Sequence, residues 1–176
     1  MTPTIVLVHG AFAESSSWDT VVDLLLDAGH PVIAAANPLR SGAVMSNVPA
    51  DAGDIVWLVY ADSFAPQAGE SCFALPGKFP GGTLGETTVR PVPRSDGATD
   101  LFITVDRFHE LFCADVPAAQ AARMALTERP ATQEALIEPS GERSLRKEVP
   151  SQAIAVSQSE ATARLILEAA ASRVAV

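Results

Sequence analysis

Few side chains in this sequence have the chemistry of a catalytic nucleophile or base. Its histidines are His9, His30 and His109, and its cysteines are Cys72 and Cys113. A hydroxyl or thiol becomes an effective nucleophile when an imidazole or another base takes its proton. His109 and Cys113 stand four residues apart, a spacing that brings two side chains onto one helix face. They are candidates for a base and a thiol nucleophile. The alternative, a half-exposed histidine beside a buried structural cysteine, is the commoner arrangement.

The elements that would position such residues begin with a βαβ unit. Ile5–Val8 is an apolar run rich in β-branched residues, as in a buried parallel strand, and Gly10 ends it. Val32–Ala36 is a second strand, and Gly29 ends the helix between the two. We therefore predict two parallel strands joined by a helix. Apolar residues at helical spacing define the buried face of that helix, and they are Trp18, Val21, Val22 and Leu25.

The rest of the chain divides into one more strand, an irregular region and several helices. Ile55–Ala61 is apolar throughout and predicts a third strand. Gln67–Thr99 is rich in Gly and Pro and predicts an irregular excursion over the sheet. Helices are predicted over Val105–Phe112 and from Asp115 to about Arg129, and a last helix is predicted to begin near Ser157.

A family resemblance covers nearly all of the chain. The segment "VLVHGAFAESSSW", Val6–Trp18, resembles the α/β-hydrolase superfamily, and within it the small-cap esterases related to plant hydroxynitrile lyases and methyl-salicylate esterases. The segments "AANPLR", "LVYADSFAPQAGES", "FHELFCADVPAAQAARMALTERP", "EPSGERS" and "AIAVSQSEATARLILEAA" are similar to successive parts of bacterial members. The resemblance implies an α/β fold over residues 1–176 as a single domain. It also implies three layers around a mostly parallel sheet, with a helical lid over about residues 67–138.

In that family the turn after the first strand forms the oxyanion hole. The resemblance gives this role to Gly10, Ala11 and Phe12, with the backbone N–H of Ala11 or Phe12 facing a developing oxyanion, and it places His9 in the pocket. Such a donor contributes about 2.7–4 kcal/mol to the barrier when a nucleophile lies beside it. Without the resemblance, His9-Gly10 reads equally well as a tight strand-to-helix turn.

The nucleophile of the family is not identifiable. It should lie in a G-x-S-x-G elbow, and no such pentapeptide is present. The nearest fragment is "RSGAVMSNV", in which Gly42 matches the last glycine of the motif and Ser41 stands where the preceding glycine is usual. About one βα repeat, on the order of 30 residues, is therefore missing before it. Ser41 is a candidate nucleophile.

A second gap lies near the end of the chain. After "EVPS", Glu148–Ser151, the family pattern has a strand with the triad acid and then a loop with the catalytic histidine, but "SQAIAVSQ" follows directly. Gln152 stands at the histidine position, and a glutamine amide cannot act as a general base near neutral pH. All three triad positions are lost, and the sheet is expected to be shortened by missing strands.

These gaps predict a protein of carboxylic-ester hydrolase ancestry whose catalysis is impaired. It would be a pseudo-enzyme, or a chain truncated by natural or deliberate deletion. The alternative belongs to a different class: a non-catalytic module that binds a small apolar ester or acid, or that forms a homo-oligomer through exposed sheet edges. Weak residual hydrolysis by Ser41 or Cys113 is a third reading.

The composition and the motifs argue against several classes of partner and cofactor. The net charge of -9 and the pI near 4.7 argue against nucleic acid, and no apolar run reaches the roughly 20 residues of a membrane span. With two cysteines and no recognisable export signal, we expect reduced thiols and a cytoplasmic location. No glycine-rich phosphate loop or metal-ligand cluster occurs, so no cofactor is expected. Asp62 and Ser63 follow the third predicted strand and are expected to face the pocket.

Overall fold

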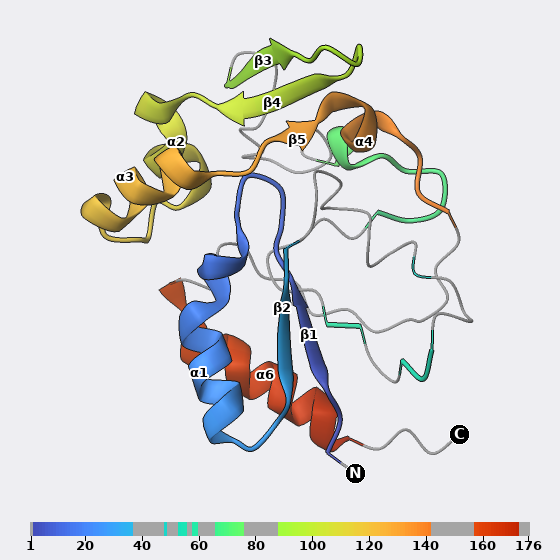
Figure 1. Cartoon of the computed structure of the whole chain (residues 1–176), viewed down its shortest axis with the longest axis vertical. Coiled ribbons are helices and arrows are strands. Elements are labelled where there is room, and N and C mark those ends of the chain that lie inside the picture. The colour runs from blue at the N-terminus through green and yellow to red at the C-terminus, as the bar shows by residue number, and fades with distance from the viewer. Residues whose placement is uncertain are drawn as a thin grey trace.

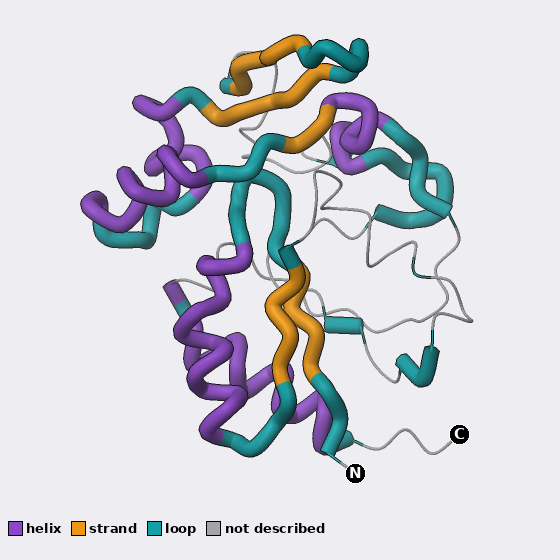
Figure 2. Tube along the Cα trace, viewed as in Figure 1, coloured by secondary structure: helices purple, strands orange, loops and turns teal. Residues whose placement is uncertain are grey.

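A computed structural model gives the structure of the chain and describes residues 2–36, 48, 53–55, 58–59, 66–75, 88–141 and 157–172. The elements, in chain order, are β1 (Ile5–Val8), the 3-10 helix η1 (Ser15–Trp18), α1 (Asp19–Asp27), β2 (Val32–Ala35), the 3-10 helix η2 (Cys72–Ala74), β3 (Val89–Pro93), β4 (Thr99–Ile103), α2 (Val105–Phe112), α3 (Ala118–Thr127), β5 (Ala131–Thr132), α4 (Gln133–Ile137) and α6 (Ser159–Ala171). They form two parts (Figures 1 and 2). We call β1, η1, α1, β2 and α6 the first layer, and the elements from η2 to α4 the cap.

The first layer contains the predicted βαβ unit. β1 and β2 pair in parallel, from Ile5 opposite Val32 to Val8 opposite Ala35. α1 and α6 lie side by side against this pair (Figure 1). Ile5 and Leu7 point toward the helices and are buried with them, which confirms the prediction of a parallel pair bridged by a helix. The buried residues of this cluster are Ile5, Leu7, Trp18, Val21, Leu25, Ala163 and Ile166.

α1 ends at Asp27, just before Gly29, as the sequence predicts. Gly29 adopts φ +82°, a left-handed conformation that costs glycine little because it has no Cβ. Its N–H donates to the Leu26 carbonyl, and the His30 N–H donates to the Leu25 carbonyl. This pair of hydrogen bonds is the Schellman motif, which satisfies the last carbonyl groups of a helix. The turn therefore directs the chain back into β2.

The segment predicted to be irregular contains an antiparallel hairpin, so that prediction is wrong. β3 pairs with β4 from Val89 opposite Ile103 to Pro93 opposite Thr99. The turn is closed by the Arg94 N–H, which donates to the Ala98 carbonyl. Gly97 supplies the positive φ that the turn requires, at +88°.

The region predicted as a helical lid contains the helices α2, α3 and α4 and also a sheet, because β3, β4 and β5 form a three-stranded sheet above the first layer (Figure 1). β5 contains only two residues, and it pairs with Asp100 and Leu101 of β4. Beyond each of its ends a glutamate replaces the missing strand. The Ile103 N–H donates to Glu128 Oε2 at 3.3 Å, and the Thr99 N–H donates to Glu134 Oε2 at 3.5 Å. Two side chains thus continue the hydrogen bonding of β4 where β5 is too short.

The helices of the cap enclose a second apolar core. α2 spans the residues predicted for it, whereas α3 is shorter than the predicted Asp115–Arg129 helix because Pro117 is its N-cap residue and Glu128 ends it. Phe12, which lies in the loop between β1 and η1, is buried in this core and connects the two parts. The buried members are Phe12, Leu101, Ile103, Phe108, Cys113, Val116, Ala121, Ala125 and Ala131.

The third predicted strand lies largely outside the described residues. Within Ile55–Ala61 only three positions are described, and one of them, Val59, packs against the apolar cluster of the first layer. The helix predicted after Ser157 is present as α6, with Gln158 at its N-cap and no side-chain capping bond from that residue. None of the helices in the described ranges is long and apolar enough to cross a membrane.

Candidate oxyanion loop and its surroundings

The four residues His9 to Phe12 form a loop that leaves the carboxyl end of β1 and reaches the cap (Figure 1). Phe12 has φ +61°, the only positive φ among the described non-glycine residues. For a residue with a Cβ this conformation costs about 1–2 kcal/mol. Backbone strain of this kind persists where the surroundings fix it, and it is concentrated at functional sites.

The cap fixes the strained residue through its ring. Phe12 is buried, and its ring meets that of Phe112 edge to face, with centroids 6.3 Å apart. Phe112 in turn packs against Phe108 at 5.0 Å. Edge-to-face aromatic pairs contribute about 0.5–1.5 kcal/mol beyond the area that they bury. The conformation of the loop therefore depends on the packing of the cap.

His9 is buried at the start of this loop, with 2% of its surface exposed. Its Nδ1 lies 3.0 Å from the carbonyl oxygen of Gly10, which can only accept a hydrogen bond, so Nδ1 carries the proton. In the neutral ring Nε2 is then an acceptor. Nε2 is buried and has no partner in the described part of the chain. A buried polar group left unpaired costs about 1–3 kcal/mol, so this nitrogen is a candidate contact for a ligand or a water.

The backbone donors of the loop are also available. The N–H groups of Ala11 and Phe12 donate to no acceptor within the described ranges. The family resemblance implies that Ala11 or Phe12 is an oxyanion donor, and the structure places both residues directly after the buried His9. The loop therefore presents unpaired donors and one unpaired acceptor within four residues, an arrangement suited to a small polar group of a ligand.

The candidate pair His109 and Cys113 has a different geometry. The Nε2 of His109 donates to the Val116 carbonyl at 2.8 Å and thereby closes the turn between α2 and α3. Cys113 is buried, and burial, together with the negative charge of Asp115, raises the pKa of its thiol to about 11. A thiolate is scarce at neutral pH under these conditions. The arrangement fits the structural alternative for both residues.

Three sequence candidates remain, and the structure adds one residue that the sequence did not indicate. Ser41, Asp62 and Ser63 lie outside the described residues. Glu128 was not singled out from the sequence, yet burial raises its pKa to about 7, against opposing effects of the Ile103 N–H and the positive charge of Arg90. No local pattern marks it, because its hydrogen-bond partner is 25 residues away.

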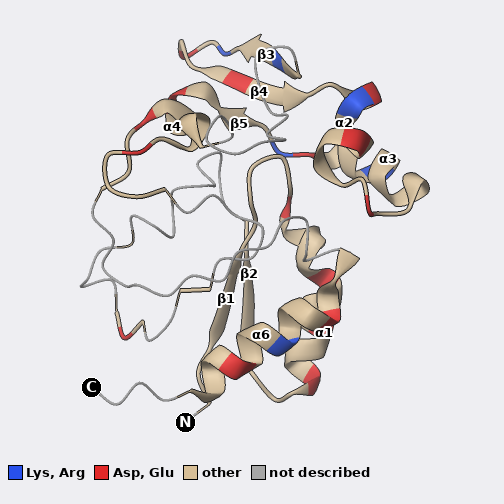
Figure 3. Cartoon of the chain, turned by 180° about the vertical axis from the view of Figure 1, so that it is seen from behind, with Lys and Arg blue, Asp and Glu red and all other residues tan. Residues whose placement is uncertain are grey.

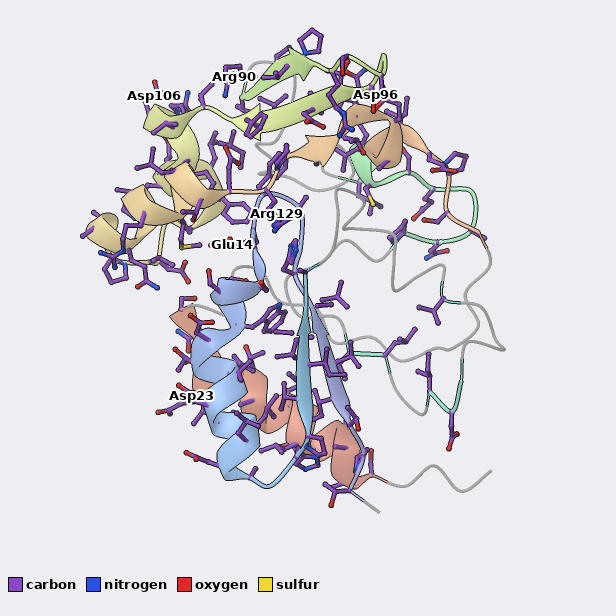
Figure 4. All side chains as sticks on the ribbon, viewed as in Figure 1. Glu14, Asp23, Arg90, Asp96, Asp106 and Arg129 are labelled. Carbon is purple, nitrogen blue, oxygen red and sulfur yellow. The ribbon has the colours of Figure 1, made fainter. Side chains whose placement is uncertain are left out.

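In Figure 4 Arg90 lies in the outer part of the cap, whereas Glu14 and Arg129 lie at the junction of the two parts.

The fold class follows from three features. They are a parallel βαβ layer, a cap of helices and strands above it, and a strained loop at the end of the first strand. The chain has an α/β-hydrolase fold, as the sequence led us to expect, and solved structures of that fold match it over nearly its whole length. No protein-family model matches the sequence, and no curated protein matches it.

Three solved structures illustrate the likeness. A pyrethroid hydrolase from Sphingobium faniae has a TM-score of 0.68 and 17% identity, covering 97% of this chain and 98% of its own. Polyneuridine aldehyde esterase has a TM-score of 0.69 and 13% identity, with coverages of 96% and 99%. An extracellular α/β-hydrolase from a Paenibacillus species, described as sharing structural and functional homology with tobacco salicylic acid binding protein 2, has a TM-score of 0.64 and 18% identity, with coverages of 96% and 99%. At these identities the likeness establishes the fold alone.

Proposed function

We propose that this chain is a protein of carboxylic-ester hydrolase ancestry that binds a small apolar ester or acid at the His9–Phe12 loop and has lost efficient ester hydrolysis. The observation that carries the proposal is the loop itself. It offers the unpaired N–H groups of Ala11 and Phe12 to an oxygen, while no described hydroxyl or thiol is hydrogen-bonded to an imidazole beside them. Binding without a nucleophile gives recognition without turnover.

The solved neighbours support the substrate class. One neighbour is named a pyrethroid hydrolase and another polyneuridine aldehyde esterase, and both share the fold. The charge distribution fits a small ligand better than a polyanion, because acidic side chains outnumber basic ones on α1, α6 and the described part of the cap (Figure 3). The cap above the loop provides the apolar surroundings that an ester or acid would need.

An activated ester and a serine-reactive probe test the loss of catalysis. We expect p-nitrophenyl acetate to be hydrolysed no faster than in a sample of the heat-unfolded chain, and a fluorophosphonate probe to label no serine. Stoichiometric labelling of Ser41, or of any other serine, would contradict the proposal. Benzoate titration tests the binding arm, because it should shift the amide resonances of Ala11 and Phe12 while leaving the turn residue Gly97 unchanged.

Self-assembly is the second candidate function, and one observation favours it. Val6 and Ile33 stand opposite each other on β1 and β2, and each is 55% exposed. An exposed β-branched pair on a sheet face is a contact surface for a second chain. Size-exclusion chromatography with light scattering should then show a dimer that Val6→Lys converts to a monomer. A wild-type monomer at all accessible concentrations would exclude this function.

A further inference from the structure

We propose that His9 Nε2 is the acceptor for the hydroxyl group of a bound neutral alcohol or phenol. The inference goes beyond the proposed function and rests on it, because it adds a contact for a hydroxyl group to the loop whose N–H groups would bind an ester or acid. The first observation is which nitrogen of the His9 imidazole carries the proton. The Gly10 carbonyl holds the proton on Nδ1, so the neutral imidazole presents only a lone pair at Nε2. That lone pair is buried and without a partner in the described ranges.

The other two histidines do not offer the same feature. His109 donates from Nε2 to the Val116 carbonyl, which places its proton on the opposite nitrogen from that of His9. His30 uses its Nδ1 toward the Pro3 carbonyl at 3.3 Å and is only partly buried. His9 is therefore the histidine that the fold places, buried and with its tautomer fixed, at the ligand end of β1.

The fixed tautomer restricts which ligand groups can bind. An acceptor pairs only with an O–H or N–H donor, so an ester carbonyl, a carboxylate or a phosphate cannot satisfy Nε2. Those oxygens would instead meet the N–H groups of Ala11 and Phe12. A neutral alcohol or phenol supplies the matching donor. The rings of Phe12, Phe108 and Phe112 pack on one another in the core next to the loop, and we therefore choose an aromatic probe.

The loop is fixed before any ligand arrives. Phe12 keeps a left-handed backbone because its ring is held in the cap core, so Gly10 and Ala11 have little freedom to turn and pair with His9. A fixed loop gains affinity by avoiding the cost of ordering on binding. A bound water is the competing occupant of the same position, and it predicts no selectivity among ligands.

Phenol and anisole make a matched pair of probes, because they share a ring and differ in the hydroxyl donor. We expect phenol to bind about 3- to 10-fold more tightly than anisole, the effect of one neutral hydrogen bond. Nitrogen-15 spectra of labelled histidine should show His9 protonated at Nδ1. The His9 Nε2 resonance should move with phenol and stay with anisole, while the His109 signals serve as the unchanged reference.

Two variants make the test specific. His9→Asn keeps a short amide able to reach the Gly10 carbonyl and has nothing at the Nε2 position, so it should bind phenol and anisole equally. His9→Gln places an amide oxygen near that position and should retain part of the preference. A wild-type ring protonated at Nε2, or equal binding of the two probes by the wild-type chain, overturns the inference even where a variant fails to fold. Serine labelling tests the proposed function separately, since active esterase chemistry would leave the phenol preference intact.

Discussion

In the first layer the buried side chains are almost all apolar and come from segments with clear periodicity, whereas the cap also uses carboxylates to complete its sheet. Leu25, Val21 and Ile166 make the first layer a conventional interface of helices with a sheet. In the cap, Glu128 and Glu134 accept N–H groups of β4 that no strand reaches. The comparison shows that the two parts of this fold differ in how far their stability should depend on ionisation.

The largest effect is expected at the centre of the cap. Phe108 is fully buried and lies against Phe112, so Phe108→Ala should lower the free energy of unfolding by about 3–5 kcal/mol. Urea unfolding followed by tryptophan fluorescence measures it. Phe73→Ala is the matched control, because this ring is 47% exposed and its loss should change stability by at most about 0.5 kcal/mol. Equal effects at the two positions would mean that Phe108 is not packed in a well-ordered core.

The counterpart in the first layer is a pair of adjacent leucines on α1. Leu25 is fully buried, and Leu25→Ala should cost about 2–5 kcal/mol. Leu26 is 52% exposed, and Leu26→Ala should cost well under about 1 kcal/mol. Hydrogen exchange sharpens the comparison. If the two parts unfold together, Leu25→Ala should lower protection in β4 as well as in β1. Unchanged protection in β4 would show that the cap unfolds independently.

Particular residues show why the first layer could be predicted and parts of the cap could not. The stripe from Trp18 to Leu25 is periodic, so the sequence alone predicts its buried face. The β3–β4 hairpin was missed because Pro91 and Pro93 interrupt the strand pattern, although Asp96-Gly97 is a recognised hairpin signal. Pro is tolerated there because β3 is an edge strand of this sheet.

The candidate site divides in the same way. The His9-Gly10 turn could be recognised in the sequence, because a buried strand followed by a glycine has a local pattern. The orphan Nε2 of His9 and the hydrogen bond from His109 to Val116 depend on where the folded chain places distant groups. The carboxylate of Glu128 has the same dependence, since its partner belongs to another strand. Contacts of this kind leave no local signal.

Phe12 tests the contact between the two parts. Alanine at this position loses the ring and keeps the strained backbone, whereas glycine loses the ring and relieves the strain. Phe12→Gly should therefore be more stable than Phe12→Ala by about 1 kcal/mol, although both should be less stable than the wild type. The control is Ala122, an exposed position in α3, where Ala122→Gly should be destabilising by about 0.5–1 kcal/mol. A glycine that is worse than alanine at both positions would show that Phe12 is not strained.

The smallest predicted change in the free energy of unfolding is the pH dependence that comes from Glu128. Its pKa in the folded chain is about 7, above the ordinary value of 4.5, because burial disfavours the charged form. A carboxyl with a raised folded pKa gives stability that is complete below the unfolded value and is lost as pH rises through the folded value. The wild type should therefore lose stability relative to Glu128→Gln between about pH 4.5 and 7, by well under the limit of about 1.4 kcal/mol per pH unit that one proton allows, because solvent screens the partly exposed Glu128.

Glu134→Gln is the matched control for Glu128→Gln, because Glu134 also accepts an N–H of β4 but is exposed and makes the longer bond. It should change the free energy of unfolding by less than about 0.5 kcal/mol at pH 6. Urea unfolding at half-unit steps of pH measures both variants against the wild type. A constant difference between the wild type and Glu128→Gln across this window would mean that Glu128 is solvated in the folded chain. The stability of the cap would then be as insensitive to ionisation as that of the first layer.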